Sequence, residues 1–197
     1  DILDILSRMR KQSLLNGYQF DSQSIYMAVE RYSNKSDLYS SLKERIGLAA
    51  SLKVSSGSVI GIDGGSTTLE LAKAISHQLE ARSIFDIEIF TNSVPVLTEI
   101  SGTLSKMEVS DKDTICRLHV LAGWCRPKSL TISCEEQKLE SMIFGGIVPD
   151  RLDISFVGAD GFFDDVGIGM TNRIEVPFKK YLIDRSQETF VLLDSSK

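Results

Sequence analysis

The chain has 197 residues, 42% of them hydrophobic, which suits one packed domain or one domain with an appendage. Its longest apolar runs are far too short to cross a bilayer, so we expect no membrane segment. The net charge is −5 and the basic residues are scattered, whereas a chain whose main task is to grip nucleic acid usually carries a basic face.

The cysteines and histidines predict neither a disulfide framework nor a metal site. Cys116, Cys125 and Cys134 form no CxxC pair, and their odd count argues against disulfides. Neither His77 nor His119 lies near a cysteine cluster, which argues against zinc. No charged-then-apolar leader begins the chain. We therefore expect a reducing, cytoplasmic compartment, cysteines that act as small hydrophobes, and neither metal nor cofactor.

Residues 1–45 differ in character from the rest and predict a helical appendage. Apolar residues from Ile2 to Met9, and again from Leu38 to Ala50, recur at the spacing of amphipathic helices. The segment between them, residues 16–35, receives no assignment.

From residue 58 onward, strand and helix patterns alternate five times. Runs rich in Val, Ile and Phe predict strands at 58–63, 86–91, 116–122, 153–159 and 188–194. Helical spacing predicts helices at 66–81, 93–104, 135–144 and 172–185, with Pro95 in the first turn of the second. The polar stretch 106–114 reads as a loop. This pattern predicts an α/β fold, a mainly parallel sheet flanked by helices, with a helical N-terminal appendage.

Small, hydroxyl or charged residues follow every predicted strand. Because ligands bind beyond the carboxyl ends of the strands in open parallel sheets, we expect these residues to share one edge. They are residues 63–68, 91–93, 123–128, 160–161 and 194–197.

The turn after the first strand, Asp63-Gly64-Gly65-Ser66-Thr67-Thr68, has the chemistry of a phosphate site. Its two glycines permit positive φ and close approach of a ligand to the backbone. The three hydroxyls and the free N–H groups of the first helical turn supply donors, and a helix amino end carries partial positive charge. Neither the Walker spacing nor GxGxxG is present. The alternative is a tight strand-to-helix turn with a Ser or Thr cap.

A helix amino end alone is too weak to hold the ligand. It contributes about 0.3–1 kcal/mol to an exposed anion, whereas millimolar binding needs about 4 kcal/mol. Lys197 and Arg126 are the best-placed cations, with Lys128 and Arg173 behind them. Asp63 would repel a phosphate, so we assign it to sugar hydroxyls, a role that Asp160 could share. The ligand is thus a phosphorylated, polyhydroxylated small molecule.

Trp124, the only tryptophan, could form a wall of the pocket or pack in the core. We favour packing.

Five sequence blocks resemble, in order and spacing, the effector-binding domain of DeoR-type bacterial transcriptional regulators. The blocks are IDGGSTTLELAKAI, FTNSVPVLTEIS, LAGWCRPKS, FVGADG with MTNRIEVPFKK after it, and the terminal VLLDSSK. The resemblance covers roughly residues 45–197. It implies a sensor domain over residues 46–197, with a fold related to ribose phosphate isomerase and glucosamine phosphate deaminase.

The resemblance also implies a function and a set of site residues. Such regulators sense sugar phosphates, and ligand binding alters the grip of a helix-turn-helix head on operator DNA. Residues 1–50 show no helix-turn-helix, so we expect that head to precede this chain or to be absent, and we expect a homo-oligomer. The ligand-binding residues carried over by motif are Asp63, Gly64, Gly65, Ser66, Thr67, Thr68, Asn92, Arg126, Asp160 and Lys197. The family usually has two glycines after the third strand, where this chain has Ala122-Gly123 followed by Trp124 and Cys125.

Two other functions stay open. An active isomerase or deaminase of this fold would need a carboxylate placed to move a proton, and Asp63, Asp160 and Asp194 are candidates. However, Gly161 stands where the related isomerases carry an acid, and the chain has no Lys-Gly-Gly run. The third possibility is an oligomerisation domain with an empty pocket.

Overall fold

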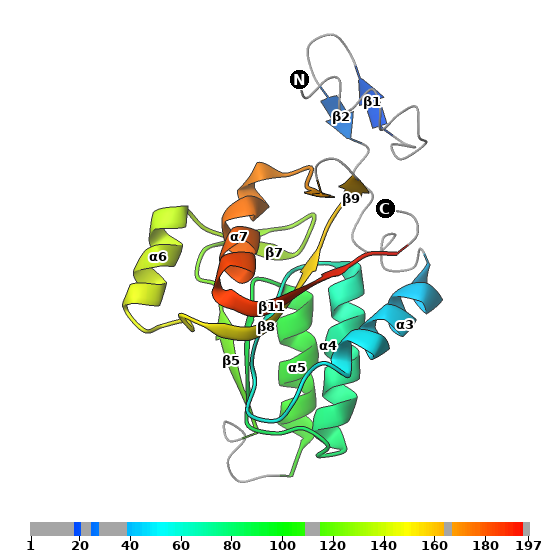
Figure 1. Cartoon of the computed structure of the whole chain (residues 1–197), viewed down its shortest axis with the longest axis vertical. Helices are drawn as coiled ribbons and strands as arrows, with labels where there is room; N and C mark the ends of the chain where they lie inside the picture. The colour runs from blue at the N-terminus through cyan, green and yellow to red at the C-terminus, as the bar shows by residue number, and fades with distance from the viewer. Residues whose placement is uncertain (1–17, 21–24, 28–38, 109–114, 164–166, 195–197) are drawn as a thin grey trace.

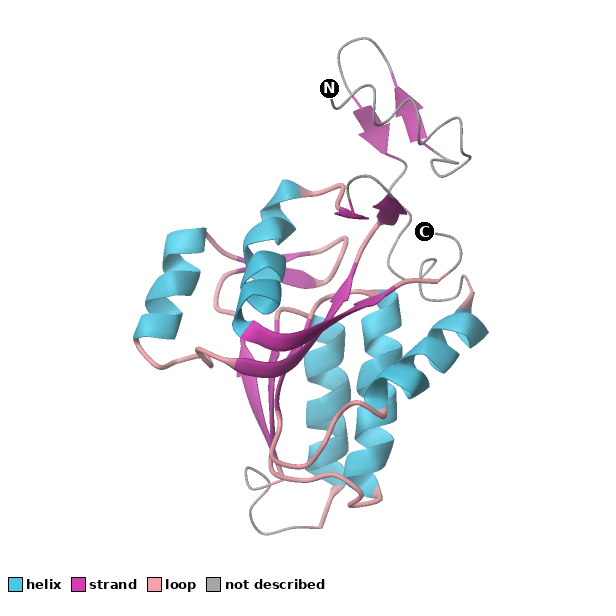
Figure 2. Cartoon of the chain, in the orientation of Figure 1, coloured by secondary structure: helices cyan, strands magenta, loops and turns pink. Residues whose placement is uncertain are grey.

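A five-stranded parallel sheet forms the centre of the protein, in the strand order β11-β8-β3-β4-β5 (Figures 1 and 2). The computed structural model describes residues 18–20, 25–27, 39–108, 115–163 and 167–194. All five strands predicted from the sequence are present, and the predicted α/β class is confirmed. They are β3 (Val59–Ile62), β4 (Ile87–Thr91), β5 (Cys116–Val120), β8 (Leu152–Gly158) and β11 (Ser186–Leu192).

Helices cover both faces of the sheet (Figure 1). One face carries α3 (Ser40–Ser51), α4 (Ser66–Glu80) and α5 (Val94–Lys106), and the other carries α6 (Glu136–Phe144) and α7 (Val176–Arg185). Alternate residues of a strand enter opposite cores. In β4, for example, Ile89 belongs to the core under α4 and α5. Its neighbour Phe90 packs edge-on against the rings of Phe178 and Tyr181 on α7, with ring centroids 5.2 and 5.3 Å apart.

The structure defines where two of the predicted helices begin. Helix α5 begins after Ser93, whose Oγ accepts a hydrogen bond from the Val96 N–H (3.3 Å). The helix predicted from residue 172 begins instead with a 3-10 turn, η1 (Arg173–Glu175), and α7 follows it. The Val176 N–H bonds to the Arg173 carbonyl, and Pro177 has no N–H with which to continue the α-helical pattern from that carbonyl.

Three short antiparallel strand pairs were not predicted. The segments β6 (Trp124–Arg126) and β7 (Thr131–Ser133) form one pair, so the third sheet strand ends at Val120 rather than at residue 122. The others are β9 (Gly161–Phe163) with β10 (Gly167–Gly169), and β1 (Tyr18–Phe20) with β2 (Ile25–Met27).

Helix α3 belongs with the sheet rather than with an appendage. A Cβ on Gly47 of α3 would lie 2.5 Å from the Glu70 carbonyl carbon, so the α3 and α4 backbones are in close contact. Helix α3 therefore runs across the predicted domain boundary at residue 45. The helix predicted near residues 2–9 lies outside the described residues, and the described part of residues 1–38 is the β1–β2 pair. No helix in the described ranges is long and apolar enough to span a membrane.

Candidate functional site

The polar loops that follow β3, β4, β5 and β8 meet at the carboxyl edge of the sheet, as the sequence predicted, whereas most of the set predicted after β11 lies outside the described residues. The loop after β3 lies against the β6–β7 hairpin, since a Cβ on Gly64 would fall 2.2 Å from Thr131 Cγ2. The same Cβ would lie 3.5 Å from the side-chain oxygen of Asn92, which follows β4. On the other side, the Gly158 N–H at the end of β8 donates to Asp63 Oδ2 (3.2 Å). These contacts bring residues from three strands and one hairpin into a single site.

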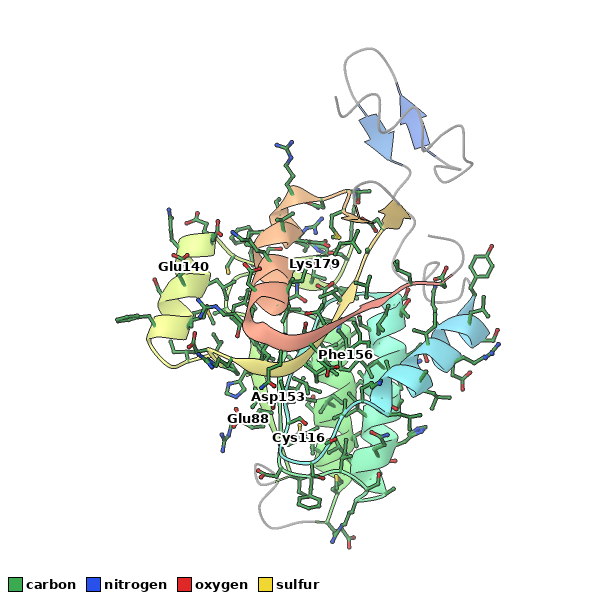
Figure 3. All side chains as sticks on the ribbon, in the orientation of Figure 1. Glu88, Cys116, Glu140, Asp153, Phe156 and Lys179 are labelled. Atoms are coloured by element: carbon green, nitrogen blue, oxygen red, sulfur yellow. The ribbon has the colours of Figure 1, made fainter. Side chains whose placement is uncertain are left out.

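Asp63 forms a buried ion pair with Lys179 of α7, a residue that the sequence analysis missed. Figure 3 labels Lys179 on this helix. Asp63 is 1% exposed and the Lys179 side chain 5% exposed. The ammonium group donates to Asp63 Oδ2 and to the Gly158 carbonyl, the latter at 2.7 Å. The predicted role of Asp63, to accept sugar hydroxyls, is therefore replaced by a structural one. Its carboxylate joins β3, β8 and α7.

The position of this ion pair matters because β3 and β8 form the switch point of the sheet. Strands β4 and β5 follow on one side of β3, and β8 and β11 lie on the other. In open α/β sheets the ligand crevice lies outside the strand ends at such a point. Here the Lys179 ammonium group bonds to residues at both strand ends, Asp63 after β3 and Gly158 of β8.

A second ion pair joins the hairpin to the start of α7. Arg126 on β6 donates from its guanidinium to Glu175 Oε1, so the cation predicted for the phosphate already has a partner. Burial raises the pKa of the Glu175 carboxyl above its ordinary value. Lys179 and Arg126 lower this pKa, while Asp63 and Asp160 raise it further. Glu175 thus interacts electrostatically with four other charged side chains of the site.

Asp160 lies in the loop after β8, where Thr171 binds it. The Thr171 hydroxyl and backbone N–H both donate to Asp160 Oδ2, at 2.6 and 3.0 Å. Asp160 is half-buried, so its carboxylate is the more accessible of the two predicted sugar-binding aspartates.

The amino end of α4 supplies the donors that the sequence predicted, although the glycines act differently. Gly65 is the N-cap residue, with extended backbone (φ 167°, ψ 166°), and neither Gly65 nor Gly64 is in the left-handed region that favours glycine. What Gly64 provides is close approach to Thr131. Leu69 is the first residue of α4 to donate back into the turn, to the Gly65 carbonyl (3.1 Å), so the N–H groups of residues 66–68 remain as donors. No Ser or Thr caps this helix, in contrast with α5.

Beside this helix end lies an acceptor without a partner. Asn92 is 1% exposed, and its Oδ1 is buried with no hydrogen-bond partner in the described part of the chain. Buried polar side chains normally have at least one partner. A ligand or a water that donates a hydrogen bond would satisfy this oxygen.

Comparison with known proteins identifies the domain. A family model described as the DeoR C terminal sensor domain matches residues 39–197. The chain belongs to this family. Two curated relatives are each 26% identical: an uncharacterized HTH-type transcriptional regulator of Staphylococcus epidermidis and a putative sgc region transcriptional regulator of Escherichia coli. The matches cover 84% and 83% of this chain but 58% and 54% of the relatives. The sensor domain thus spans a little over half the length of these regulators.

Solved structures confirm the isomerase-like fold of the sensor domain. Ribose 5-phosphate isomerase from Plasmodium falciparum superposes with a TM-score of 0.53 at 17% identity, over 80% of this chain and 52% of that one. A D-ribose-5-phosphate isomerase in complex with phospho-erythronic acid gives 0.54 at 18% identity, over 80% and 53%. The enzyme from Methanocaldococcus jannaschii gives 0.53 at 18% identity, over 80% and 54%.

The remaining residues predicted for the site of the DeoR sensor domain lie at the surface or outside the described residues. Lys197 is outside them, and Lys128 and Arg173 are exposed. The favoured core position of Trp124 is wrong, because this side chain is 49% exposed. Cys125 is exposed too, unlike the other two cysteines, so it is not a packed hydrophobe. Within the described ranges, no three His, Cys, Asp or Glu side chains are grouped to hold a metal ion.

Proposed function

We propose that this domain binds a phosphorylated sugar or sugar alcohol at the carboxyl edge of its sheet and thereby controls DNA binding by a helix-turn-helix domain elsewhere in a longer protein. One observation carries the ligand part of the proposal. The amino end of α4 has no side-chain cap, and it lies beside the buried Oδ1 of Asn92, which has no hydrogen-bond partner among the described residues. Donors for an anion and an acceptor for a hydroxyl are therefore adjacent.

The phosphate binds at the N–H groups of residues 66–68. The Thr68 hydroxyl is engaged with the Gly65 carbonyl (3.1 Å), and Thr67 is buried, so the half-buried Ser66 offers the most accessible hydroxyl. The helix dipole supplies about 0.3–1 kcal/mol, well below the roughly 4 kcal/mol of a millimolar complex. Charge-assisted hydrogen bonds from the backbone supply more. Lys197 and Arg126 add cations, Arg126 by sharing its guanidinium between Glu175 and the phosphate.

The hydroxyl groups of the sugar bind on the two sides of the α4 loop. Asn92 Oδ1 accepts a hydrogen bond from one hydroxyl, and the half-buried carboxylate of Asp160 accepts from another. Both acceptors follow strands that flank the α4 loop, β4 and β8. This arrangement suits a molecule that has an anion at one end and several hydroxyls along its length.

The domain acts as a sensor without turnover. An isomerase needs a carboxylate that can move a proton beside the substrate carbonyl. The Asp63 carboxylate is buried under Lys179, and Gly161 follows Asp160 where the related isomerases carry an acid. The fold alone does not imply catalysis, since one fold serves many functions. Conversion of a pentose or hexosamine phosphate by the purified chain would support the enzyme instead.

The regulatory part of the proposal rests on the relatives. Both matched proteins have names that describe transcriptional regulators, and this chain covers only part of each. The longer protein binds operator DNA as a symmetric homo-oligomer, and effector binding changes its affinity for that DNA. Gel-shift titrations of the longer protein with and without the effector measure this change.

A thermal-shift panel tests the ligand directly. Pentose, hexose and hexitol phosphates are compared with the same sugars lacking phosphate, and a ligand that binds the native state must raise the melting temperature. Ser66→Asp should abolish the shift, because it places a carboxylate where the phosphate binds. An acid in the first turn favours the helix itself, so the variant should stay folded.

Ser40→Asp at the first position of α3 is the matched control and should keep the full ligand response. If no phosphorylated compound raises the melting temperature, or if both variants respond alike, the proposal is wrong.

A further inference from the structure

Trp124 is the first residue of β6, in the hairpin whose Thr131 lies against the α4 loop. The hairpin register places Trp124 opposite Ser133 and Arg126 opposite Thr131. Residues two apart on a strand share a face, and so do residues directly opposite one another. Trp124 therefore shares one face of the hairpin with these three polar residues.

This face is turned toward the loop at the amino end of α4. The Thr131 methyl group fills the space that a Gly64 Cβ would need, at 2.2 Å. Ser133 is 3% exposed, and its Oγ is buried without a hydrogen-bond partner among the described residues. The face thus adds a second unsatisfied polar atom to the one on Asn92. It also presents an indole ring that is half exposed, although tryptophan is on average a highly buried residue.

We infer that Trp124 is the platform on which the effector stacks, and that it selects a phosphorylated sugar in its closed-ring form over the corresponding open-chain sugar alcohol. This inference rests on the proposed function and narrows its ligand class. One face of a pyranose ring presents C–H groups and is apolar and flat, which matches an indole surface. An open-chain polyol has no such rigid face, and ordering it on the indole costs conformational entropy.

The geometry of β6 fits a ring with a phosphate to one side. Trp124 and Arg126 are two residues apart, which separates them by about 6.5 Å along the strand. The apolar end of the site is then at Trp124, and the polar end is at Arg126 and the α4 loop. Pockets for small molecules commonly combine an aromatic wall with a few placed polar groups in this way.

Because Trp124 is the only tryptophan in the chain, the tryptophan emission of the wild type reports on the surroundings of this one side chain. The titrants are glucose, mannose and galactose 6-phosphates, each beside the sugar alcohol phosphate made by reducing it. At least one closed-ring compound should change the emission and bind at least 10-fold more tightly than its reduced partner. Titration calorimetry, which needs no tryptophan, should show that Trp124→Ala weakens the binding of that compound at least 10-fold and the binding of its reduced partner less than threefold.

Two further variants complete the experiment. Trp124→Phe should recover most of the affinity, and Phe144→Ala, which removes an aromatic ring that is 98% exposed on α6, should change nothing. Equal affinities of the wild type for a closed-ring compound and its reduced form, or an unchanged affinity in Trp124→Ala, overturn the inference while the proposed function stands. A change of oligomer size in Trp124→Ala with unchanged affinity assigns the ring to a subunit contact and also overturns it. Failure of every phosphorylated compound to bind the wild type overturns both.

Discussion

Replacing Lys179 by methionine tests whether the buried ion pair holds the carboxyl edge together. The substitution leaves Asp63, which is 1% exposed, with the Gly158 N–H as its one remaining hydrogen bond among those shown for its side chain. Removing one partner of a buried ion pair typically costs about 3–5 kcal/mol, because the other charge stays buried without compensation. In a chain of this size, that loss corresponds to a fall in melting temperature of roughly 6–20 °C.

The neighbouring lysine provides a matched control. Lys180 has a 63% exposed side chain and approaches Glu136 only to 3.8 Å. Exposed ion pairs of this kind contribute about 0–1 kcal/mol. Lys180→Met should therefore cost no more than about 1 kcal/mol, although the chemical change is identical.

Urea denaturation of the two variants, and of Asp63→Asn alone and combined with Lys179→Met, gives the free energies of unfolding. The double variant should be more stable than the sum of the single losses predicts, by about 0.5–3 kcal/mol, since the two groups compensate each other. Equal losses for Lys179→Met and Lys180→Met would refute the reasoning. Additive losses in the double variant would show that the two charges are not coupled.

Three further predictions concern the surroundings of the site. In the native protein Cys125 alone should react quickly with a thiol reagent, and the other two cysteines only after unfolding; rapid reaction of more than one thiol would contradict the burial described. Because burial raises the pKa of Glu175 above 4.5, the native state binds more protons than the unfolded state there, and stability falls as the pH rises through the native pKa. The melting temperature of Glu175→Gln minus that of the wild type should therefore increase with pH above 4.5, and a constant difference would count against this. Gly64→Ala should lower the free energy of unfolding by about 1–3 kcal/mol, because the added Cβ forces Thr131 aside. Gly102→Ala in α5 should raise it by about 0.5–1 kcal/mol, because no heavy atom lies within 4 Å of the added Cβ. The reverse order would contradict the close contact at Gly64.

The sheet was predictable because its strands are short apolar runs, each followed by a helix or a turn. Strand residues buried on either face of the sheet, such as Ile89 and Phe90 of β4, give short apolar runs that can be recognised without any knowledge of neighbouring strands. The order of the strands in the sheet could not be predicted in this way, because it depends on which face of the sheet each connecting helix covers. The hairpin at Trp124 was missed for a related reason. Its strands have three residues each, too few to show an alternating pattern.

Lys179 shows most clearly why part of the site could not be predicted. Two lysines stand side by side in the sequence, and both look like surface charges on an amphipathic helix. One signal was available, because Lys179 lies three residues before the buried Leu182 and so falls on the stripe of α7 that faces the sheet. Its partner, Asp63, is 116 residues away along the chain, and only the packing of α7 over β3 and β8 brings the two together.

The central claim is that a phosphoryl group binds at the amino end of α4. The most direct measurement is a crystal structure of the chain with the tightest-binding phosphorylated sugar from the thermal-shift panel. The account predicts phosphate oxygens within about 3 Å of the backbone nitrogens of residues 66–68, with a sugar hydroxyl donating to Asn92 Oδ1. A phosphate bound elsewhere on the domain, with those nitrogens and Asn92 in contact with solvent alone, would contradict it.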